Sequence, residues 1–367
     1  MNQCVFTRIV GAFFLSAALV APLGFSARAA EQPTTSPSGR SREAIVKDLQ
    51  GVQQELQAAI GSPDQLFDAK KRAELGPKAL PIMKRMLALI DELSAVQPVP
   101  KNSRMSFASL LVLLDDPQAT AELNAYAQSA DPKAATAGKG MLLLVRWWKT
   151  AEDAAAQGKV VDDLEALAKA NPDDAYLPQV AMAMTQQGAA NKEIRQRIVN
   201  IVSRTMTSPV AKQVASQLEA DAKLASLEGK PLVIQGVQLN GTNFSTADWK
   251  GKVILVDFWA SWCAPCRAEL PHVKSIYKQY HEKGLEILGV SCDYKEDVLK
   301  KFLADNPEMS WPELFDAAKP GWHALTTEYG IQGIPTMLLI DRKGVVRTVE
   351  ARGKLDELIP KLLEEKE

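Results

Sequence analysis

Cysteine and histidine are scarce in this chain, which has four cysteines and three histidines in 367 residues. So few cysteines exclude a fold held together by many disulfides. A zinc ribbon would need a second C-x-x-C or a Cys/His pair, and neither is present. The formal net charge is −1, and no cluster of Lys and Arg suggests nucleic-acid binding. Beyond the first ~30 residues, no apolar run is long enough to span a membrane.

The N-terminus has the pattern of an export signal. Arg8 precedes an uncharged apolar stretch, 9–23, and 27–29 has the A-x-A form of a cleavage site. We therefore expect a signal peptide at 1–29 and a periplasmic or cell-surface protein; an uncleaved membrane anchor is the alternative. Cleavage would remove Cys4 and leave three cysteines, an odd number, so the close pair among them suggests chemistry rather than a structural bridge.

The remainder divides by composition into a linker and two domains. The segment 30–41 is rich in Pro, Ser, Thr and Gly and is typical of a flexible linker. The segment 42–228 is helical in pattern. Its first helix places five apolar residues on one face: Ile45, Leu49, Val52, Leu56 and Ile60. From 229 to 367 the pattern alternates between strands and helices.

The helical domain, 42–228, carries no catalytic pattern. Breaks at Asp131-Pro132, Asn171-Pro172 and Pro209 recur at intervals of roughly 40 residues, in the range of tetratricopeptide or HEAT repeats. An irregular helical bundle is the alternative, and both remain open. The roles that we expect for this domain are partner docking, self-association or spacing.

In the segment 229–367 the expected order of elements is ββαβα(β)αββα, a mixed sheet with helices on its faces. Asn240-Gly241 is a hairpin turn signal. The run "KVILVDFWA" predicts a central strand, buried on both faces. A helix is expected at 264–283, with Pro271 inside it, and "WPELFD" is a possible strand.

The motif "WCAPC" lies where this central strand meets the following helix. Cys263 would sit at the helix N-terminus, where free N–H groups and the helix dipole stabilise an anion. The thiolate is the reactive form of cysteine. Cys266 would lie one turn later, placed to attack a mixed disulfide formed on Cys263. This arrangement predicts two-step thiol–disulfide exchange.

Two further features support a redox site. Asp257 lies amid apolar residues, and burial raises the pKa of a carboxyl group, which suits it to move a proton to or from Cys266; the alternative is an acid at the end of the sheet that backbone donors satisfy. Pro335 directly precedes a strand and could be cis. The backbone of Ile334 would then offer its N–H and C=O to an extended peptide.

The segments "VDFWASWCAPC" and "YGIQGIPT" resemble the two signature segments of the thioredoxin family, and "FWASWCAPCRAELP" is similar to its exported TlpA/ResA-type branch. The resemblance covers 229–367 and implies a thioredoxin fold. It implies that Cys263 is the nucleophile, Cys266 the resolving cysteine, Asp257 the buried acid and Pro335 the cis-proline. Trp259, Trp262 and Pro271 match family positions, with Trp262 beside the substrate. Glu269 would tune Cys266, or would lie on a solvated helix face.

The resemblance implies an exported thiol-disulfide oxidoreductase that reduces protein disulfides, apocytochrome c cysteines among them. Its electrons would come from a membrane thiol donor, because the sequence has no nicotinamide or flavin motif. Two other functions remain open: a redox-sensing interaction protein that docks a partner through its helical domain, and a thiol peroxidase. The peroxidase would want Thr where Ala260 stands. We expect Cys292 to be a buried filler residue.

Overall fold

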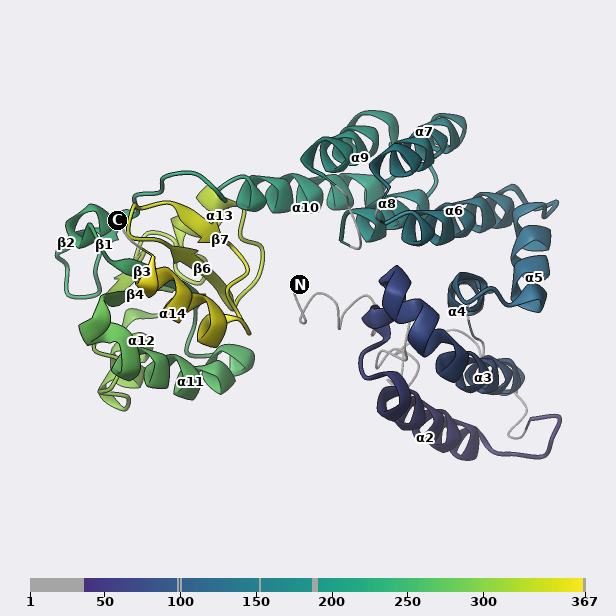
Figure 1. Ribbon diagram of the computed structural model, residues 1–367, viewed down its shortest axis with the longest axis horizontal. Coiled ribbons are helices and arrows are strands. Elements are labelled where there is room, and N and C mark those ends of the chain that lie inside the picture. Colours follow the sequence, from purple (N-terminus) through teal and green to yellow (C-terminus); the bar gives the residue numbers. More distant parts are fainter. Residues whose placement is uncertain (1–35, 98, 100, 152, 187–190, 366–367) are drawn as a thin grey trace. The chain divides into compact units, whose positions relative to one another are not determined.

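The computed structural model describes residues 36–97, 99, 101–151, 153–186 and 191–365, and these form two compact units that divide between Ser216 and Gln217 (Figure 1). The expected signal peptide and the first part of the linker lie outside the described residues. The end of that linker forms a turn on the helical unit. Ser36 Oγ donates to Glu92 Oε1 over 2.8 Å and Arg40 Nη1 to Glu92 Oε2 over 2.9 Å.

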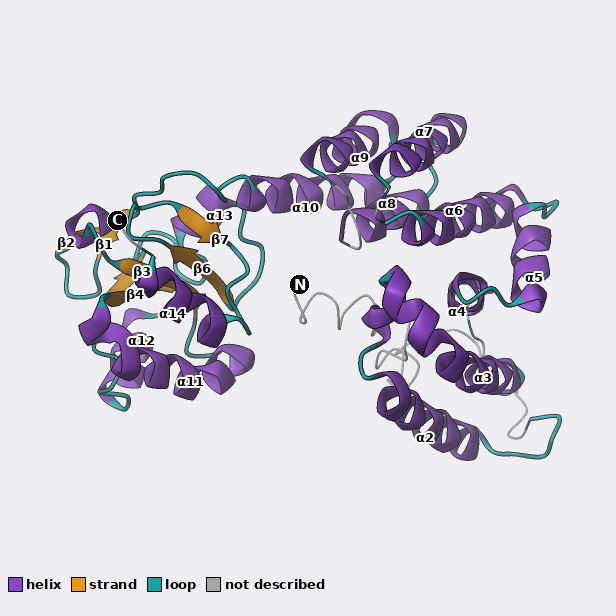
Figure 2. Ribbon diagram, viewed as in Figure 1, coloured by secondary structure: helices purple, strands orange, loops and turns teal. Residues whose placement is uncertain are grey.

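The first unit is helical throughout its regular structure (Figure 2). Its helices are α2 (Arg42–Ile60), α3 (Ala69–Ser94), α4 (Lys101–Leu113), α5 (Pro117–Ala127), α6 (Pro132–Lys149), α7 (Ala154–Ala170), α8 (Leu177–Gln186), α9 (Lys192–Thr205) and α10 (Pro209–Ala225), with the short η1 (Pro63–Phe67). Most helices pack against the next one, and α4 with α6, α6 with α8 and α7 with α9 also pack together. Each helix of this unit thus packs mainly against helices close to it along the chain. The five apolar residues expected on one face of α2 are all buried, as predicted.

The sequence breaks that look alike have different roles in this unit. Asp131 caps the start of α6, where its carboxylate accepts from Lys133 N, and Pro132 occupies the first turn. Asn171, by contrast, ends α7. The two dipeptides therefore do not mark equivalent positions in successive helices.

The second unit is a mixed sheet covered by helices. Its elements are β1 (Gln235–Val237), β2 (Asn243–Ser245), η2 (Thr246–Trp249), β3 (Val253–Trp259), α11 (Ala264–Tyr280), η3 (His281–Lys283), β4 (Leu285–Ser291), α12 (Glu296–Ala304), β5 (Glu313–Phe315), α13 (Ala324–Tyr329), β6 (Thr336–Ile340), β7 (Val346–Thr348) and α14 (Leu355–Glu364). The strand order is β5-β4-β3-β6-β7. β3, β4 and β5 are parallel, while β6 and β7 are antiparallel to their neighbours. This is the expected thioredoxin fold, and "WPELFD" does contain a strand.

The two faces of the sheet have separate cores. On one face, side chains of α11, α12 and α14 pack with Leu255 and Trp259 of β3. On the other, α13 packs with Val256 and Phe258, and Leu224 near the end of α10 joins them. β3 is buried along its whole length, because it lies at the centre of the sheet with helices on both sides. The last turns of α10, which the sequence assigns to the helical domain, thus pack with the second unit.

Both edges of the sheet are covered by the same stretch of chain, 229–239. At the β7 edge, Gly229 N donates to Val346 O over 2.8 Å and Val346 N to Lys230 O over 2.9 Å. At the β5 edge, Leu239 N donates to Glu313 O over 2.8 Å. The same stretch includes β1, the first strand of the β1–β2 hairpin, whose turn lies at Gly241 as predicted.

Candidate active site

The two cysteines lie at the junction of β3 and α11. Cys263 is the N-cap residue of α11, and Pro265 stands in the first turn, where no N–H is needed. Cys263 and Cys266 form a disulfide, with their Cα atoms 5.3 Å apart. The N–H of Cys266 points at Cys263 Sγ over 3.2 Å. The helix N-terminus therefore directs a backbone donor at the first sulfur, which favours negative charge there.

Asp257 is a buried acid in the strand that leads to this pair. It lies in the middle of β3 and is 8 % exposed, and its Oδ1 has no hydrogen-bond partner among the described residues. Burial, and then the charge of Glu269, raises the pKa of Asp257 to about 7, while Arg352 opposes the shift. Without local hydrogen bonds to hold the charged form, this carboxyl can take up or release a proton near neutral pH.

Glu269 lies one turn after Cys266 in α11 and belongs to a chain of charged groups. Arg352 Nε donates to its Oε2 over 3.2 Å, and its Oε1 lies 3.2 Å from His272 Nδ1. Asp356, and then Glu269, raises the pKa of His272. Glu269 is thus paired and partly buried rather than freely solvated, and its charge acts on Asp257.

Of the expected substrate residues, Trp262 directly precedes Cys263, while Ile334 and Pro335 lie on a separate segment. The Ile334–Pro335 peptide bond is cis, as expected, and it directly precedes β6, whose Thr336 pairs with Phe258 of β3. Ile334 packs against the core cluster that holds both cysteines. Trp262 is 47 % exposed, so an aromatic ring stands open to solvent beside Cys263.

Some residues of this site carry no local signal in the sequence. Arg352 reaches Glu269 only through the folding of the chain after β7. Tyr294 is 64 % exposed and its ring centroid lies 5.6 Å from that of Trp262, which its sequence position gives no reason to expect. Cys292 is buried and free, as predicted, and burial raises the pKa of its thiol to about 11. Within the described ranges, no group of three ligating side chains could hold a metal ion.

Comparison with known proteins agrees with this geometry. The redoxin family model matches residues 221–359. A "thiol-disulfide oxidoreductase ResA" of Bacillus thuringiensis subsp. konkukian is 31% identical over 128 residues, which span 34% of this chain and 71% of that protein. The chain belongs to the thioredoxin-like thiol-disulfide oxidoreductases.

Other relatives also match between a third and a half of this oxidoreductase. The ResA protein of Halalkalibacterium halodurans is 28% identical over 149 residues, 41% of this chain and 82% of that protein. Among solved structures, the thioredoxin domain of a thiol-disulfide oxidoreductase from Bacteroides vulgatus is 30% identical, with a TM-score of 0.33 over 37% of this chain and 98% of that chain. The redoxin match begins in the last turns of α10 and so leaves the helical unit unassigned.

Proposed function

We propose that this oxidoreductase is exported and reduces protein disulfides through Cys263 and Cys266. The proposal is supported by a cysteine pair at a helix N-terminus, by a buried acid with a raised pKa in the preceding strand, and by a cis-proline whose neighbour Ile334 packs against the core cluster that holds both cysteines. Export rests on the signal-like pattern at 1–29. No helix within the described ranges combines the length and apolar character needed to cross a bilayer.

The proposed reaction has two exchange steps. The Cys263 thiolate attacks one sulfur of the substrate disulfide, that S–S bond breaks, and the other substrate sulfur leaves as a thiolate that solvent protonates. Asp257 then takes the thiol proton of Cys266, whose thiolate attacks Cys263 Sγ and releases the first substrate sulfur as a thiolate. The substrate gains two electrons, and the protein is left with the Cys263–Cys266 disulfide.

In this proposal the substrate chain lies along the cis-proline loop. The backbone of Ile334 offers its polar groups to an extended peptide, while Trp262 covers the peptide from the other side. A thiol donor then returns two electrons to the disulfide. We propose a membrane protein as this donor, with apocytochrome c cysteines as one class of substrate, and a role for the helical unit in binding a partner.

Replacement of each cysteine tests the mechanism. Cys263→Ser should abolish reduction of a model protein disulfide, and Cys266→Ala should accumulate mixed disulfides with the substrate, detectable on non-reducing gels. Cys292→Ala is the matched control, because that thiol is buried and unpaired, and it should keep its activity. Retained activity in Cys263→Ser would refute the mechanism.

The redox potential of the pair tests the direction of electron flow. A value near the roughly −270 mV of thioredoxin would support a reductant, whereas one near the roughly −120 mV of DsbA would indicate an oxidant. Equilibration with glutathione buffers, read from the fluorescence of the neighbouring tryptophans, gives this value.

A further inference from the structure

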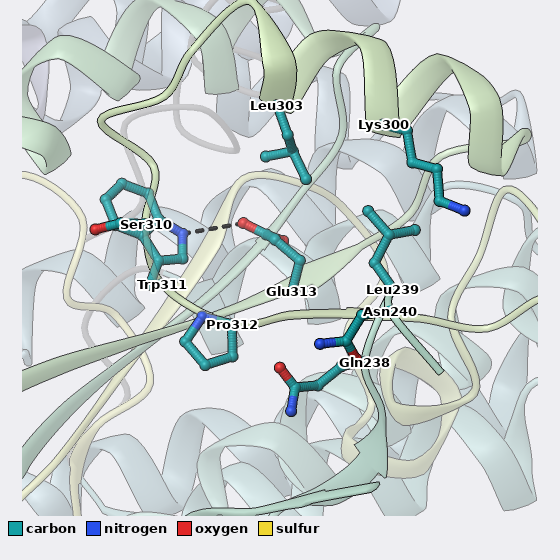
Figure 3. A pocket seen from close by; sticks show the side chains of 9 residues that line it. All are labelled: Gln238, Leu239, Asn240, Lys300, Leu303, Ser310, Trp311, Pro312 and Glu313. Atoms are coloured by element: carbon teal, nitrogen blue, oxygen red, sulfur yellow. Dashed lines mark hydrogen bonds between the residues drawn. The ribbon is translucent and has the colours of Figure 1, made fainter. Parts of the chain in front are cut away.

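A second buried acid, Glu313, lies beside the site described above. It is the first residue of β5 and is 4 % exposed. Its Oε2 accepts a hydrogen bond from Trp259 Nε1 over 2.9 Å, and its Oε1 accepts one from Trp311 Nε1 over 2.9 Å; Figure 3 shows the second of these. Two indole donors thus fix the orientation of a carboxyl group that apolar packing would otherwise exclude.

The sheet register places Glu313 and Asp257 on one face. Asp257 pairs with Gly289 of β4, and Gly289 pairs with Glu313 of β5. Side chains at paired positions point to the same side of a sheet. The carboxyls of Asp257 on β3 and Glu313 on β5 therefore project from the same face, with β4 between their strands. Only Gly289, which has no side chain, stands between them.

The Glu313 carboxyl extends over this glycine toward β3. A Cβ on Gly289 would lie 2.0 Å from Glu313 Oε2 and 2.2 Å from its Oε1, so the carboxyl fills the space that a side chain would take. The hydrogen bond from Trp259 Nε1 shows that the Glu313 carboxyl extends as far as β3. Trp259 stands two residues after Asp257, on the same face of that strand. The glycine therefore leaves no side chain of β4 between the two acids.

The charge of Asp257 acts on Glu313. Burial, opposed by the Trp259 hydrogen bond, raises the pKa of Glu313 to about 8, and the charges of Asp257 and Asp293 add to the increase. Asp257 in turn is raised by burial and Glu269 and lowered by Arg352. Interacting acids of this kind titrate as a pair, since ionising one makes it harder to ionise the other.

A pocket of about 410 Å³ reaches Glu313 from the surface. Its other lining residues come from the turn after β1, from α12 and from the segment before β5 (Figure 3): Gln238, Leu239, Asn240, Lys300, Leu303, Ser310, Trp311 and Pro312. Lys300 is the one cation among them. The lining includes neither cysteine nor any residue of the cis-proline loop. The pocket therefore connects Glu313 to solvent by a path that does not pass the cysteines.

We propose that Glu313 is a second proton-holding residue of this site, which forms a coupled carboxyl pair with Asp257 and exchanges its proton with solvent through the pocket. The inference rests on the proposed role of Asp257 as the acid–base partner of Cys266. When a donor thiolate attacks Cys263, the Cys263–Cys266 bond breaks and Cys266 leaves as a thiolate. Asp257 gives this thiolate a proton, Glu313 replaces the proton on Asp257, and water in the pocket reprotonates Glu313.

Infrared titration of the oxidised protein tests the pairing without any substrate. Above about pH 6, where ordinary carboxyls have ionised, the remaining carbonyl band of protonated carboxylic acids should disappear in two steps in the wild type, near pH 7 and pH 8. Glu313→Gln should leave one step. Asp257→Asn should also leave one, moved to lower pH by about one unit because the neighbouring negative charge is gone. A Glu313 step at unchanged pH in Asp257→Asn would overturn the proposal, and this variant keeps Glu313 in place should Glu313→Gln fail to fold.

Stopped-flow kinetics provide the functional test. Glu313→Gln should slow reduction of the Cys263–Cys266 disulfide by a small-molecule dithiol roughly tenfold near neutral pH, and its pH profile should show one ionisation in place of two. Trp311→Phe is the control, because it removes one hydrogen bond but keeps the acid, and it should keep both ionisations. A wild-type pH profile in Glu313→Gln would overturn this inference while leaving the Cys263-dependent activity, and so the proposed function, intact.

Discussion

Asp257 shows how one residue links the stability of this protein to its chemistry. It stands in a strand with no other polar residue, and its pKa is raised from 3.8 to about 7. A group whose pKa is raised on folding binds more protons in the folded state between its two pKa values. Stability from the protonated form is therefore complete below pH ~4 and is lost as the pH rises toward 7.

Asp257→Asn should remove this pH dependence, because the amide cannot ionise. Relative to the wild type, the variant should gain nothing from this group below pH ~4, and its advantage in free energy of unfolding should grow from there to pH 8, to at most ~4 kcal/mol for a shift of this size. Denaturant unfolding of the oxidised proteins at several pH values measures the difference. A difference that stays constant across this range would contradict the assignment.

Gly289 and Glu313 should be coupled energetically. Gly289→Ala forces a Cβ to 2.0 Å from the glutamate carboxyl, and we expect a loss of about 1–3 kcal/mol. In a Glu313→Ala background the same change should cost much less, since the clashing carboxyl is gone. A double-mutant cycle of unfolding free energies measures this coupling, and additive losses would show that the carboxyl does not occupy this space.

Elements of the second unit could be predicted from the sequence, whereas the pairing of their residues could not. Turn residues and apolar runs bound each strand and helix locally, as with Gly241 in the hairpin and Gly330 after α13. Asp257 stands out in the sequence because it interrupts an apolar run. Glu313 carries no such signal, because its two indole partners and its glycine neighbour meet it only once β3, β4 and β5 are in register. In the helical unit, one of two similar dipeptides begins a helix and the other ends one. The spacing of these dipeptides along the sequence therefore does not give the spacing of the helices.

Gly330 ends α13 and also allows α10 to approach. Its φ is 76°, and a Cβ there would lie 2.4 Å from Ala220 O in the last turns of α10. Gly330→Ala should therefore combine left-handed strain with a clash against backbone, at a cost of about 2–4 kcal/mol.

Gly344→Ala is the matched control for Gly330→Ala. Its φ of 78° is nearly the same, but a Cβ at Gly344 would meet nothing within 4 Å. It should cost only the backbone term, about 1 kcal/mol. Thermal unfolding of both variants gives the comparison, and equal losses would mean that α10 does not pack closely at Gly330.

The described residues form two units, and the boundary between them along the chain falls within α10. The last turns of α10 contribute Leu224 to the core of the oxidoreductase unit, and Leu227 follows it there. A polypeptide of residues 217–367 should therefore fold and reduce disulfides on its own, and one of residues 229–367 should be less stable by a few kcal/mol, because it lacks two apolar side chains of that core. Calorimetry and a disulfide-reduction assay on both test this, and equal stability would show that α10 adds nothing.

The covered edges of the sheet have a consequence for how copies of this protein behave together. An open edge strand invites hydrogen bonding from another molecule, which is a route to polymerisation into fibres. Here the single stretch 229–239 occupies the outer side of both β7 and β5. A protease cut within this stretch would weaken its hydrogen bonds to β7 and to β5 together, and so would expose both edges of the sheet. The cut chains would keep their cysteine pair but would be prone to aggregate edge to edge. We therefore expect the intact segment to protect the protein against aggregation.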